Sequence, residues 1–298
     1  GLVGSEMCIR DRIYLDHAAT TPVDKTVVEA MQNYMLNNWH NPSSIYIEGQ
    51  RSSNAIQKSR EDIANFIGAI PEEIFFTSGG SESNNLAIRG VVESFENENI
   101  HIVTSSVEHH AVIDTIEMLS SQKKITFSHV HPNKEGEILA DKVLESITKD
   151  TKLVSIMHAN NEVGAINDIK LITEKIKAHN PNILVHSDSV QYVAHFPIDV
   201  KDLDCDFYAI SCHKVYGPTG VGILYAKKKW LEKLPPYIGG GGMISEVKKD
   251  KITPGRPTII KAACQPLSPK GAIVGSGKAL VHNWTIRPPK NKPIPAPR

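Results

Sequence analysis

The stretch Ile183-Leu184-Val185-His186-Ser187-Asp188 decides the fold class of this chain, together with Gln191 three positions further on. It is a short, mainly apolar run of β-forming residues that ends in an acidic side chain. Runs of this kind are typical of strands in a mainly parallel sheet whose two faces are both covered by helices. The stretch therefore predicts a buried strand that carries Asp188 and Gln191 at its carboxyl end.

The same pattern recurs along the chain and alternates with helical periodicity. Further β-rich runs lie at residues 74–77, 101–104, 124–130, 153–157, 207–210 and 221–225. Helical patterns lie near residues 24–37, 50–67, 82–96, 109–121, 140–148 and 168–179. Alternation of this kind predicts an α/β fold with a mainly parallel sheet and helices on both faces. Ligands of such sheets bind beyond the carboxyl ends of the strands, so polar residues at those ends are the candidates for a site.

Composition and charge narrow the class of protein. The chain has 298 residues, of which 40% are hydrophobic, so it can bury one large domain and has room for a smaller one. Lysine and arginine together number 33, as do aspartate and glutamate, so the net charge indicates neither nucleic acid nor a membrane surface as partner. Cys8, Cys205, Cys212 and Cys264 form neither a CxxC pair nor an evident disulfide framework, which fits a reducing compartment, and we expect a cytoplasmic protein.

The two ends of the chain differ in character from the part between them. Residues 1–12 have no helical or strand period and are interpreted as a foreign, artefactual leader. Residues 259–298 form a basic, proline-rich tail that cannot build a core, either because it is disordered or because the reading frame was lost. We therefore expect residues 13–258 to form the large domain.

The segment Thr77-Ser78-Gly79-Gly80-Ser81-Glu82-Ser83-Asn84-Asn85 joins a predicted strand to a predicted helix. Its glycines let the backbone approach a ligand closely, and Ser81 could cap a helix whose free amides attract an anion. The segment therefore favours a phosphate site at Gly80 and Ser81. A plain strand-to-helix turn would use the same residues.

Polar side chains follow two other strands. His109 comes after the strand at 101–104, where it could stack on an aromatic ring and transfer protons; a solvated histidine at a helix start is the alternative. Asn160 and Asn161 follow the strand at 153–157, and their amides could hydrogen-bond a ring oxygen or a carboxylate. Asparagine-rich turns are common, so this second signal is weak alone.

Lys214 ends the run Ala209-Ile210-Ser211-Cys212-His213-Lys214. A lysine just past a buried strand can be a nucleophilic amine where desolvation disfavours its charge. Pyridoxal phosphate needs from a protein an amine for its carbonyl group, an acid for its ring nitrogen and a polar partner for its ring oxygen. Lys214, Asp188 and Gln191 could supply these three groups. The alternatives are a helix-capping Asp188 with Gln191 in its capping box, and an exposed Lys214 in a loop.

Taken together, these motifs resemble those of the cysteine desulfurases, a group within the class-V aminotransferase family. The resemblance runs from Ile13 to about Gly255. It rests on the segments Tyr14-Leu15-Asp16-His17-Ala18-Ala19-Thr20-Thr21-Pro22, Asn41-Pro42-Ser43-Ser44, 76–86, Glu108-His109, the HANNEVG stretch at 158–164, Asp188 with Gln191, and 211–218. It implies the large domain of pyridoxal-phosphate fold type I, the aspartate aminotransferase-like fold, with the small carboxyl-terminal domain missing.

The resemblance also implies a role for each candidate residue. Lys214 would be the Schiff-base lysine and Asp188 the partner of the pyridinium nitrogen. His109 would stack on the ring and act in catalysis, while Asn161 and Gln191 would bond near the ring hydroxyl. The phosphate would be held by the four remaining residues, Gly80, Ser81, Ser211 and His213.

The implied reaction takes sulfur from L-cysteine, releases L-alanine and leaves a persulfide on a protein thiol. The persulfide would serve the synthesis of iron-sulfur clusters or thio-cofactors. The implied partners are L-cysteine, a second copy of the chain in a homodimer, and a sulfur-acceptor or iron-sulfur scaffold protein. Neither nucleic acid nor a membrane is implied, and no metal is expected.

The thiol-bearing carboxyl-terminal region of the family has no match in this chain, and none of the four cysteines takes the place of its persulfide cysteine. Cys205 in particular is expected to be a buried, small hydrophobic residue. We therefore expect the chain as written to bind the cofactor and to form little or no persulfide. The alternatives are a sibling of the selenocysteine lyase type and a catalytically dead, cofactor-binding scaffold module.

Overall fold

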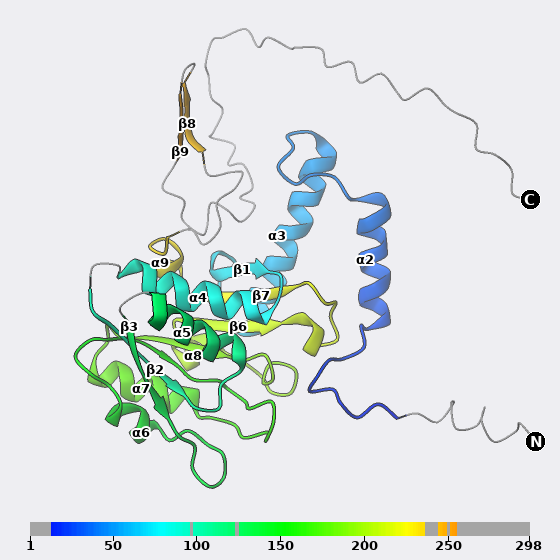
Figure 1. The fold of residues 1–298 in the computed structure, drawn as a ribbon. Helices are drawn as coiled ribbons and strands as arrows, with labels where there is room; N and C mark the ends of the chain where they lie inside the picture. Colours follow the sequence, from blue (N-terminus) through cyan, green and yellow to red (C-terminus); the bar gives the residue numbers. More distant parts are fainter. Residues whose placement is uncertain (1–12, 96–97, 123–124, 236–243, 249–250, 255–298) are drawn as a thin grey trace, which may run out of the picture. The chain divides into compact units, whose positions relative to one another are not determined.

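The computed structural model describes residues 13–95, 98–122, 125–235, 244–248 and 251–254. Its centre is a seven-stranded sheet with the strand order β1-β7-β6-β5-β4-β2-β3 (Figure 1). The strands are β1 (Ile74–Thr77), β2 (Ile100–Ser105), β3 (Ile125–Val130), β4 (Thr151–Ser155), β5 (Leu184–Asp188), β6 (Phe207–Ser211) and β7 (Gly222–Ala226). Strands β3, β2, β4, β5 and β6 pair in parallel, and β7 runs antiparallel to both β6 and β1. The predicted α/β class with a mainly parallel sheet is confirmed.

The predicted helices are present, with ends close to those expected. They are α2 (Lys25–Asn37), α3 (Ile47–Ile67), α4 (Gly80–Ser94), α5 (His110–Gln122), α6 (Ala140–Glu145) and α7 (Ile169–His179). Shorter elements were not predicted: α8 (Val200–Leu203), α9 (Lys228–Leu231), the 3-10 turns η1 (Pro71–Glu73) and η2 (Cys212–Lys214), and the hairpin β8 (Ile244–Lys248) with β9 (Lys251–Pro254). The short helices and the 3-10 turns do not complete enough helical turns to produce a periodic pattern.

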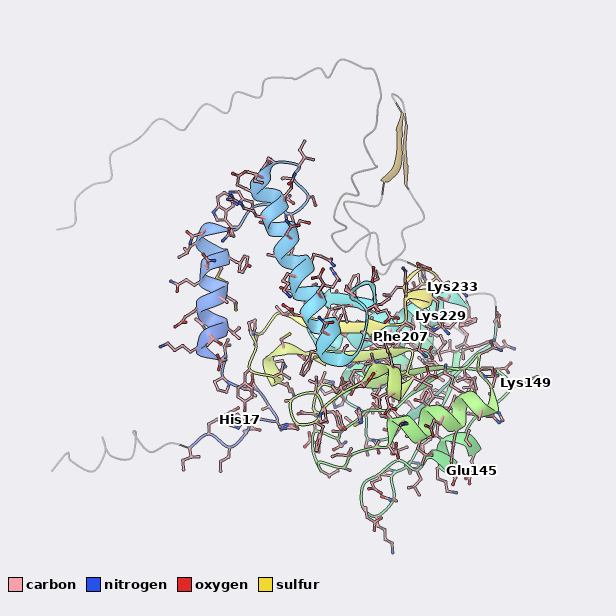
Figure 2. All side chains as sticks on the ribbon, turned by 180° about the vertical axis from the view of Figure 1, so that it is seen from behind. His17, Glu145, Lys149, Phe207, Lys229 and Lys233 are labelled. Atoms are coloured by element: carbon pink, nitrogen blue, oxygen red, sulfur yellow. The ribbon has the colours of Figure 1, made fainter. Side chains whose placement is uncertain are left out.

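Both faces of the sheet are covered, which explains why its strands are apolar on both sides. Along β5, Leu184 packs into a cluster with residues of α4 and α5, and its neighbour Val185 packs into a second cluster with residues of α3, α6 and α7. Phe207 of β6 is fully buried, whereas Glu145 and Lys149 are exposed at the outside of the domain (Figure 2). Burial of each large apolar side chain contributes about 1.5–3 kcal/mol.

The turn between β1 and α4 lies directly against the start of β7. A Cβ atom on Gly222 would lie 2.5 Å from the Cα of Gly79, so only glycine fits at Gly222. Within the same turn, a Cβ on Gly80 would come within 2.7 Å of a methyl group of Val190. The close packing brings the beginning of α4 next to the ends of β5 and β6.

Among the helices that the structure describes, none is both long and apolar enough to cross a membrane.

Glu108 is a buried carboxyl group that links two loops at the carboxyl edge of the sheet. One carboxyl oxygen accepts hydrogen bonds from Ser105 Oγ (2.6 Å) and from the backbone nitrogen of Met157 (2.8 Å). The other oxygen has no hydrogen-bond partner among the described residues. Burial raises the pKa of Glu108 to about 8, against the opposing effect of these two hydrogen bonds. Glu108 is therefore mainly protonated at neutral pH in the folded chain.

We predict that Glu108→Gln stabilises the chain at alkaline pH and not at pH 5. A raised folded-state pKa favours folding below the unfolded value near 4.5, and this contribution is lost as the pH rises through about 8. Glutamine resembles the protonated acid, so the variant loses no stability over that window. The difference in free energy of unfolding should grow by at most about 1.4 kcal/mol per pH unit. Urea titrations between pH 5 and 9 measure it.

Glu117→Gln is the matched control, because Glu117 is exposed on α5. The variant should follow the parent chain across the same pH range. A Glu108→Gln curve that runs parallel to the parent curve at every pH would show that Glu108 is ionised in the folded chain.

Candidate active site

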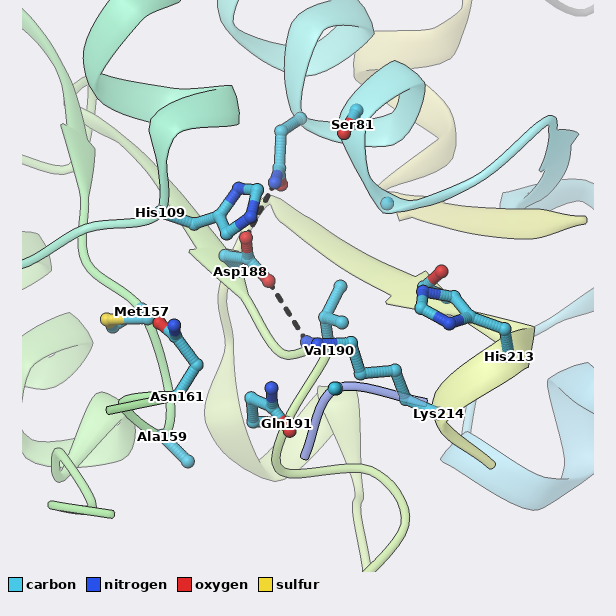
Figure 3. A pocket seen from close by; sticks show the side chains of 14 residues that line it. Ser81, His109, Met157, Ala159, Asn161, Asp188, Val190, Gln191, His213 and Lys214 are labelled. Carbon is cyan, nitrogen blue, oxygen red and sulfur yellow. Dashed lines mark hydrogen bonds between the residues drawn. The ribbon is translucent and has the colours of Figure 1, made fainter. Parts of the chain in front are cut away.

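A cavity of about 290 Å³ opens at the carboxyl edge of the sheet (Figure 3). It contains all nine residues selected from the sequence: Gly80, Ser81, His109, Asn161, Asp188, Gln191, Ser211, His213 and Lys214. The other residues that line it are Ala19, Asn84, Met157, Ala159 and Val190. The predicted residues come from the ends of different strands, and the parallel arrangement of the sheet brings them together.

Asp188 lies at the floor of this cavity and is held by two hydrogen bonds. Its carboxyl group accepts from the backbone nitrogen of Val190 (3.0 Å) and from Asn84 Nδ2 (2.6 Å) (Figure 3). Burial raises the pKa of Asp188, while these hydrogen bonds and the nearby His109 and Lys214 act in the opposite direction. The carboxyl group is thus oriented by the protein and poorly solvated.

The capping-box alternative for Asp188 and Gln191 is wrong. The residues after Asp188 form turns and no helix. Gln191 Nε2 donates to the backbone oxygen of Ala18 (2.9 Å) and does not reach back to the backbone of Asp188. Both side chains are therefore available to line a site.

Lys214 lies in η2 and is half-buried, so the alternative of an exposed lysine in a loop is wrong. Its Nζ donates to the backbone oxygen of Ala18 (2.7 Å). Desolvation lowers the pKa of Lys214, and the carboxylates of Asp188 and Asp16 partly offset this effect. A lowered pKa increases the fraction of neutral amine, which is the form that attacks a carbonyl carbon.

Gly80, Ser81, Ser211 and His213 line the side of the cavity at the start of α4. The amino end of a helix of this length favours an anion, because its first amides have no partner within the helix. The expectation that Ser81 caps the helix is wrong. The helix begins at Gly80, two residues earlier than that expectation, with Gly79 as its N-cap, so Ser81 lies inside the first turn.

His213 contributes an imidazole to the same side of the cavity. Its Nδ1 lies 3.1 Å from Thr20 Oγ1. Desolvation and the neighbouring Lys214 both lower the pKa of His213. The ring is therefore more readily neutral than a solvated histidine at the same pH.

His109 is exposed at the start of α5, and its ring also faces the cavity (Figure 3). Its Nδ1 accepts a hydrogen bond from the backbone nitrogen of Ala111 (3.0 Å), so a backbone amide and not solvent satisfies this atom. The position at the helix start, which the alternative interpretation gave, is compatible with a ring that faces the cavity. Since Nδ1 accepts, the neutral ring carries its hydrogen on Nε2.

The two consecutive asparagines after β4 have different roles. Asn160 is buried and builds the loop: its Nδ2 donates to the oxygen of Val107 (2.9 Å), and its Oδ1 accepts from the backbone nitrogens of Glu162 and Val163. Asn161 lines the cavity. Only Asn161 is therefore in a position to contact a ligand.

Sequence reasoning missed two contributions to the site. Asn84 was quoted only as part of the glycine-rich segment; its position four residues after Gly80 on a helix is the signal that could have placed it on the same face. The second is the segment around Ala18 and Ala19, for which no site role was assigned. The backbone oxygen of Ala18 accepts hydrogen bonds from Lys214 and Gln191. A backbone atom has no signature in the sequence.

The described cysteines do not line the cavity. Cys205 is fully buried, as predicted, and burial raises the pKa of its thiol to about 12. Cys212 is half-buried, and desolvation raises the pKa of its thiol as well. Cys8 and Cys264 lie outside the described residues.

The chain is similar to known proteins over most of its described part. It is 44% identical to the cysteine desulfurase IscS of Dictyoglomus turgidum over 235 residues, 78% of this chain and 58% of the relative. It is 44% identical to the cysteine desulfurase IscS of Methanosarcina thermophila over 249 residues, 83% of this chain and 60% of the relative. The chain therefore spans about three fifths of the length of these relatives.

A solved structure described as SspA in complex with cysteine has the same fold. The TM-score is 0.73 at 41% sequence identity, with 78% of this chain and 66% of the other covered. The family Aminotransferase class-V matches residues 13–282, and this match begins at the residue where the resemblance from motifs begins. The chain belongs to the aminotransferase class-V family.

Proposed function

We propose that the chain binds pyridoxal phosphate covalently through Lys214 and forms the cofactor-binding part of a cysteine desulfurase. The observation that carries this proposal is the meeting of Lys214, Asp188 and the amino end of α4 in one cavity. An amine of lowered pKa, a buried carboxylate and an anion-binding helix end match the aldehyde, the ring nitrogen and the phosphate of this cofactor.

The described residues fit such a group. Gly80 leaves bare backbone at the edge of the cavity, where a Cβ atom would collide with Val190. Burial disfavours the charge of Asp188, and a cationic ring nitrogen beside it would compensate for that charge. Lys214 is the lysine that lines the cavity among the described residues.

Each residue has a task in the proposed function. Lys214 carries the covalent link and afterwards moves a proton at its Nζ. Asp188, fixed by Asn84, holds a proton on the ring nitrogen. His109 covers the ring, and Asn161 and Gln191 orient its oxygen. When bound, pyridoxal phosphate supplies an electron-accepting ring that acidifies the α-hydrogen of an attached amino acid.

The phosphate side is assigned to four residues around the start of α4 and η2: Gly80, Ser81, Ser211 and His213. Backbone amides and hydroxyl groups bind an anion without adding a full charge of their own. The positive partial charge of the helix end provides the electrostatic attraction.

The proposed substrate is L-cysteine. The desulfurase names of the relatives and the cysteine-bound neighbour support this choice. The reaction transfers the substrate sulfur to a thiol and releases L-alanine. The homodimer, the sulfur-acceptor or iron-sulfur scaffold partner and the cytoplasmic location stay predictions, as do the domain boundaries at residues 12 and 258.

A second candidate is a cofactor-binding module without desulfurase activity. It is favoured by the state of the described thiols, because both Cys205 and Cys212 have raised pKa values and neither lines the cavity. A thiolate is the nucleophile in sulfur transfer, so these two side chains are poor acceptors for the substrate sulfur.

Lys214→Ala should abolish covalent cofactor binding. The parent chain with pyridoxal phosphate should develop a yellow absorbance band that borohydride bleaches, and mass spectrometry should place the reduced adduct on Lys214. Lys201→Ala is the matched control, because Lys201 is exposed on α8 and does not line the cavity. An adduct that persists in Lys214→Ala, or that maps to another lysine, would contradict the assignment.

L-Cysteine distinguishes the two candidate functions. Added to the yellow holoprotein with a reducing thiol as sulfur acceptor, it should yield L-alanine and sulfide if the chain is a competent desulfurase. A spectral change on addition of L-cysteine without alanine would support the module. A folded chain that shows no colour with the cofactor would overturn both.

Asp188→Asn should weaken cofactor binding by about tenfold to a hundredfold, because a charge-assisted contact contributes roughly 1.5–3 kcal/mol. Without cofactor the variant should be less stable than the parent, since an amide has one acceptor oxygen for the two donors, Val190 N and Asn84 Nδ2, that the carboxyl group satisfies. Fluorescence titration and thermal unfolding measure the two quantities. Asp62→Asn, on the exposed side of α3, is the control. A loss of stability without a loss of affinity would make Asp188 a structural residue only.

A further inference from the structure

We infer that the amino-terminal segment 17–21, here called the strap, positions Lys214 for cofactor binding, and that Thr21 is its positioning residue. The inference rests on the proposed function of the cavity. It gives a task to the motif at residues 14–22, to which the proposed function assigns none. The contacts that support it are the hydrogen bonds between the strap and the loop that carries Lys214.

Thr21 bridges the two sides of Lys214. Its backbone nitrogen and its Oγ1 both donate to the backbone oxygen of His213, at 2.8 and 2.9 Å. The same Oγ1 accepts from the backbone nitrogen of Tyr216 (2.8 Å). Only 8% of Thr21 is exposed, so water competes little for these contacts. One hydroxyl group thus fixes the backbone directly before Lys214 and two residues after it.

The loop needs such support because Tyr216 has an unusual backbone conformation. Its φ of 61° lies in the left-handed region, which is uncommon for a residue with a side chain. Its backbone oxygen accepts from the nitrogen of Asp24 (2.9 Å), and its nitrogen donates to Thr21. Conformations of this kind persist where surrounding contacts determine them, and here one contact comes from Thr21 of the strap and the other from Asp24 shortly after it.

The strap also contacts the reactive amine directly. The backbone oxygen of Ala18 accepts from Lys214 Nζ (2.7 Å) and from Gln191 Nε2 (2.9 Å). One carbonyl therefore holds the free amine of Lys214 beside the side chain assigned to the cofactor oxygen. The strap sets both the backbone and the amine of Lys214, although 196 residues separate Ala18 from Lys214 in the chain.

Thr21→Val tests this role, because valine keeps the shape and removes the hydroxyl. We expect cofactor affinity to fall about tenfold, as for the loss of one well-formed buried hydrogen bond. The rise in melting temperature that the cofactor produces should shrink. Thr21→Ser keeps the hydroxyl and should restore both quantities to near the parent values.

Thr173→Val is the matched control. Thr173 is buried like Thr21, and its hydroxyl donates to the backbone oxygen of Ile169 within α7, away from the cavity. It should bind the cofactor like the parent chain. Parent-like affinity of Thr21→Val, or a Thr21→Ser variant as weak as Thr21→Val, would overturn the inference.

Hydrogen exchange tests the strap without the cofactor. In the cofactor-free chain, Lys214→Met removes the contact to Ala18, and the amides of residues 19–21 should exchange several-fold faster than in the parent. Unchanged exchange would overturn the inference. This comparison also decides the matter if Thr21→Val does not fold. The exchange comparison does not depend on the cofactor. If the parent chain forms no adduct at Lys214, that outcome refutes the proposed function, and the exchange comparison still tests the strap.

Discussion

The hydrogen bond from Asn84 Nδ2 to Asp188 Oδ2 is the contact on which the arrangement of the cavity depends. It is buried and joins α4 to the end of β5, across 104 residues of chain. Because α4 also begins at Gly80 and Ser81, one helix carries both the anion-binding end and the group that orients the carboxylate. The distance between these two features is therefore set by the rise of a helix, which is a rigid element.

Burial gives the cavity its electrostatic character. The same desolvation raises the pKa of Asp188 and lowers that of Lys214, so each group is driven toward its neutral form while their mutual attraction opposes this change. Glu108, nearby at the same edge of the sheet, has a raised pKa for the same reason. Clusters of perturbed groups in a cavity are characteristic of sites that do chemistry. A ligand with charges complementary to Asp188 and to the start of α4 would compensate for part of the free energy lost by desolvating these groups.

Much of the fold could be predicted because its strands are covered on both faces. Leu184 and Val185 are adjacent, yet each faces a different hydrophobic cluster, so the strand has to be apolar throughout and is recognisable without its partners. Turns such as η2 could not be predicted in this way, since a three-residue element has no period. Asn160 and Asn161 illustrate the same limit within the site. They are adjacent and chemically identical, and only the path of the loop decides which one lines the cavity.

The sequence by itself determined the α/β class and the strand ends that carry polar residues, and the resemblance to the desulfurases selected the nine candidates that meet in the cavity. The first two properties are local, because they depend only on where the apolar runs lie and on which polar residues come directly after them. The tertiary structure alone decided that Asn84 holds Asp188, that Ser81 is no helix cap, and that the strap holds Lys214. These depend on helix phase and on backbone atoms brought together from distant parts of the chain. A carbonyl oxygen such as that of Ala18 is chemically the same in every residue, so only its position in space distinguishes it.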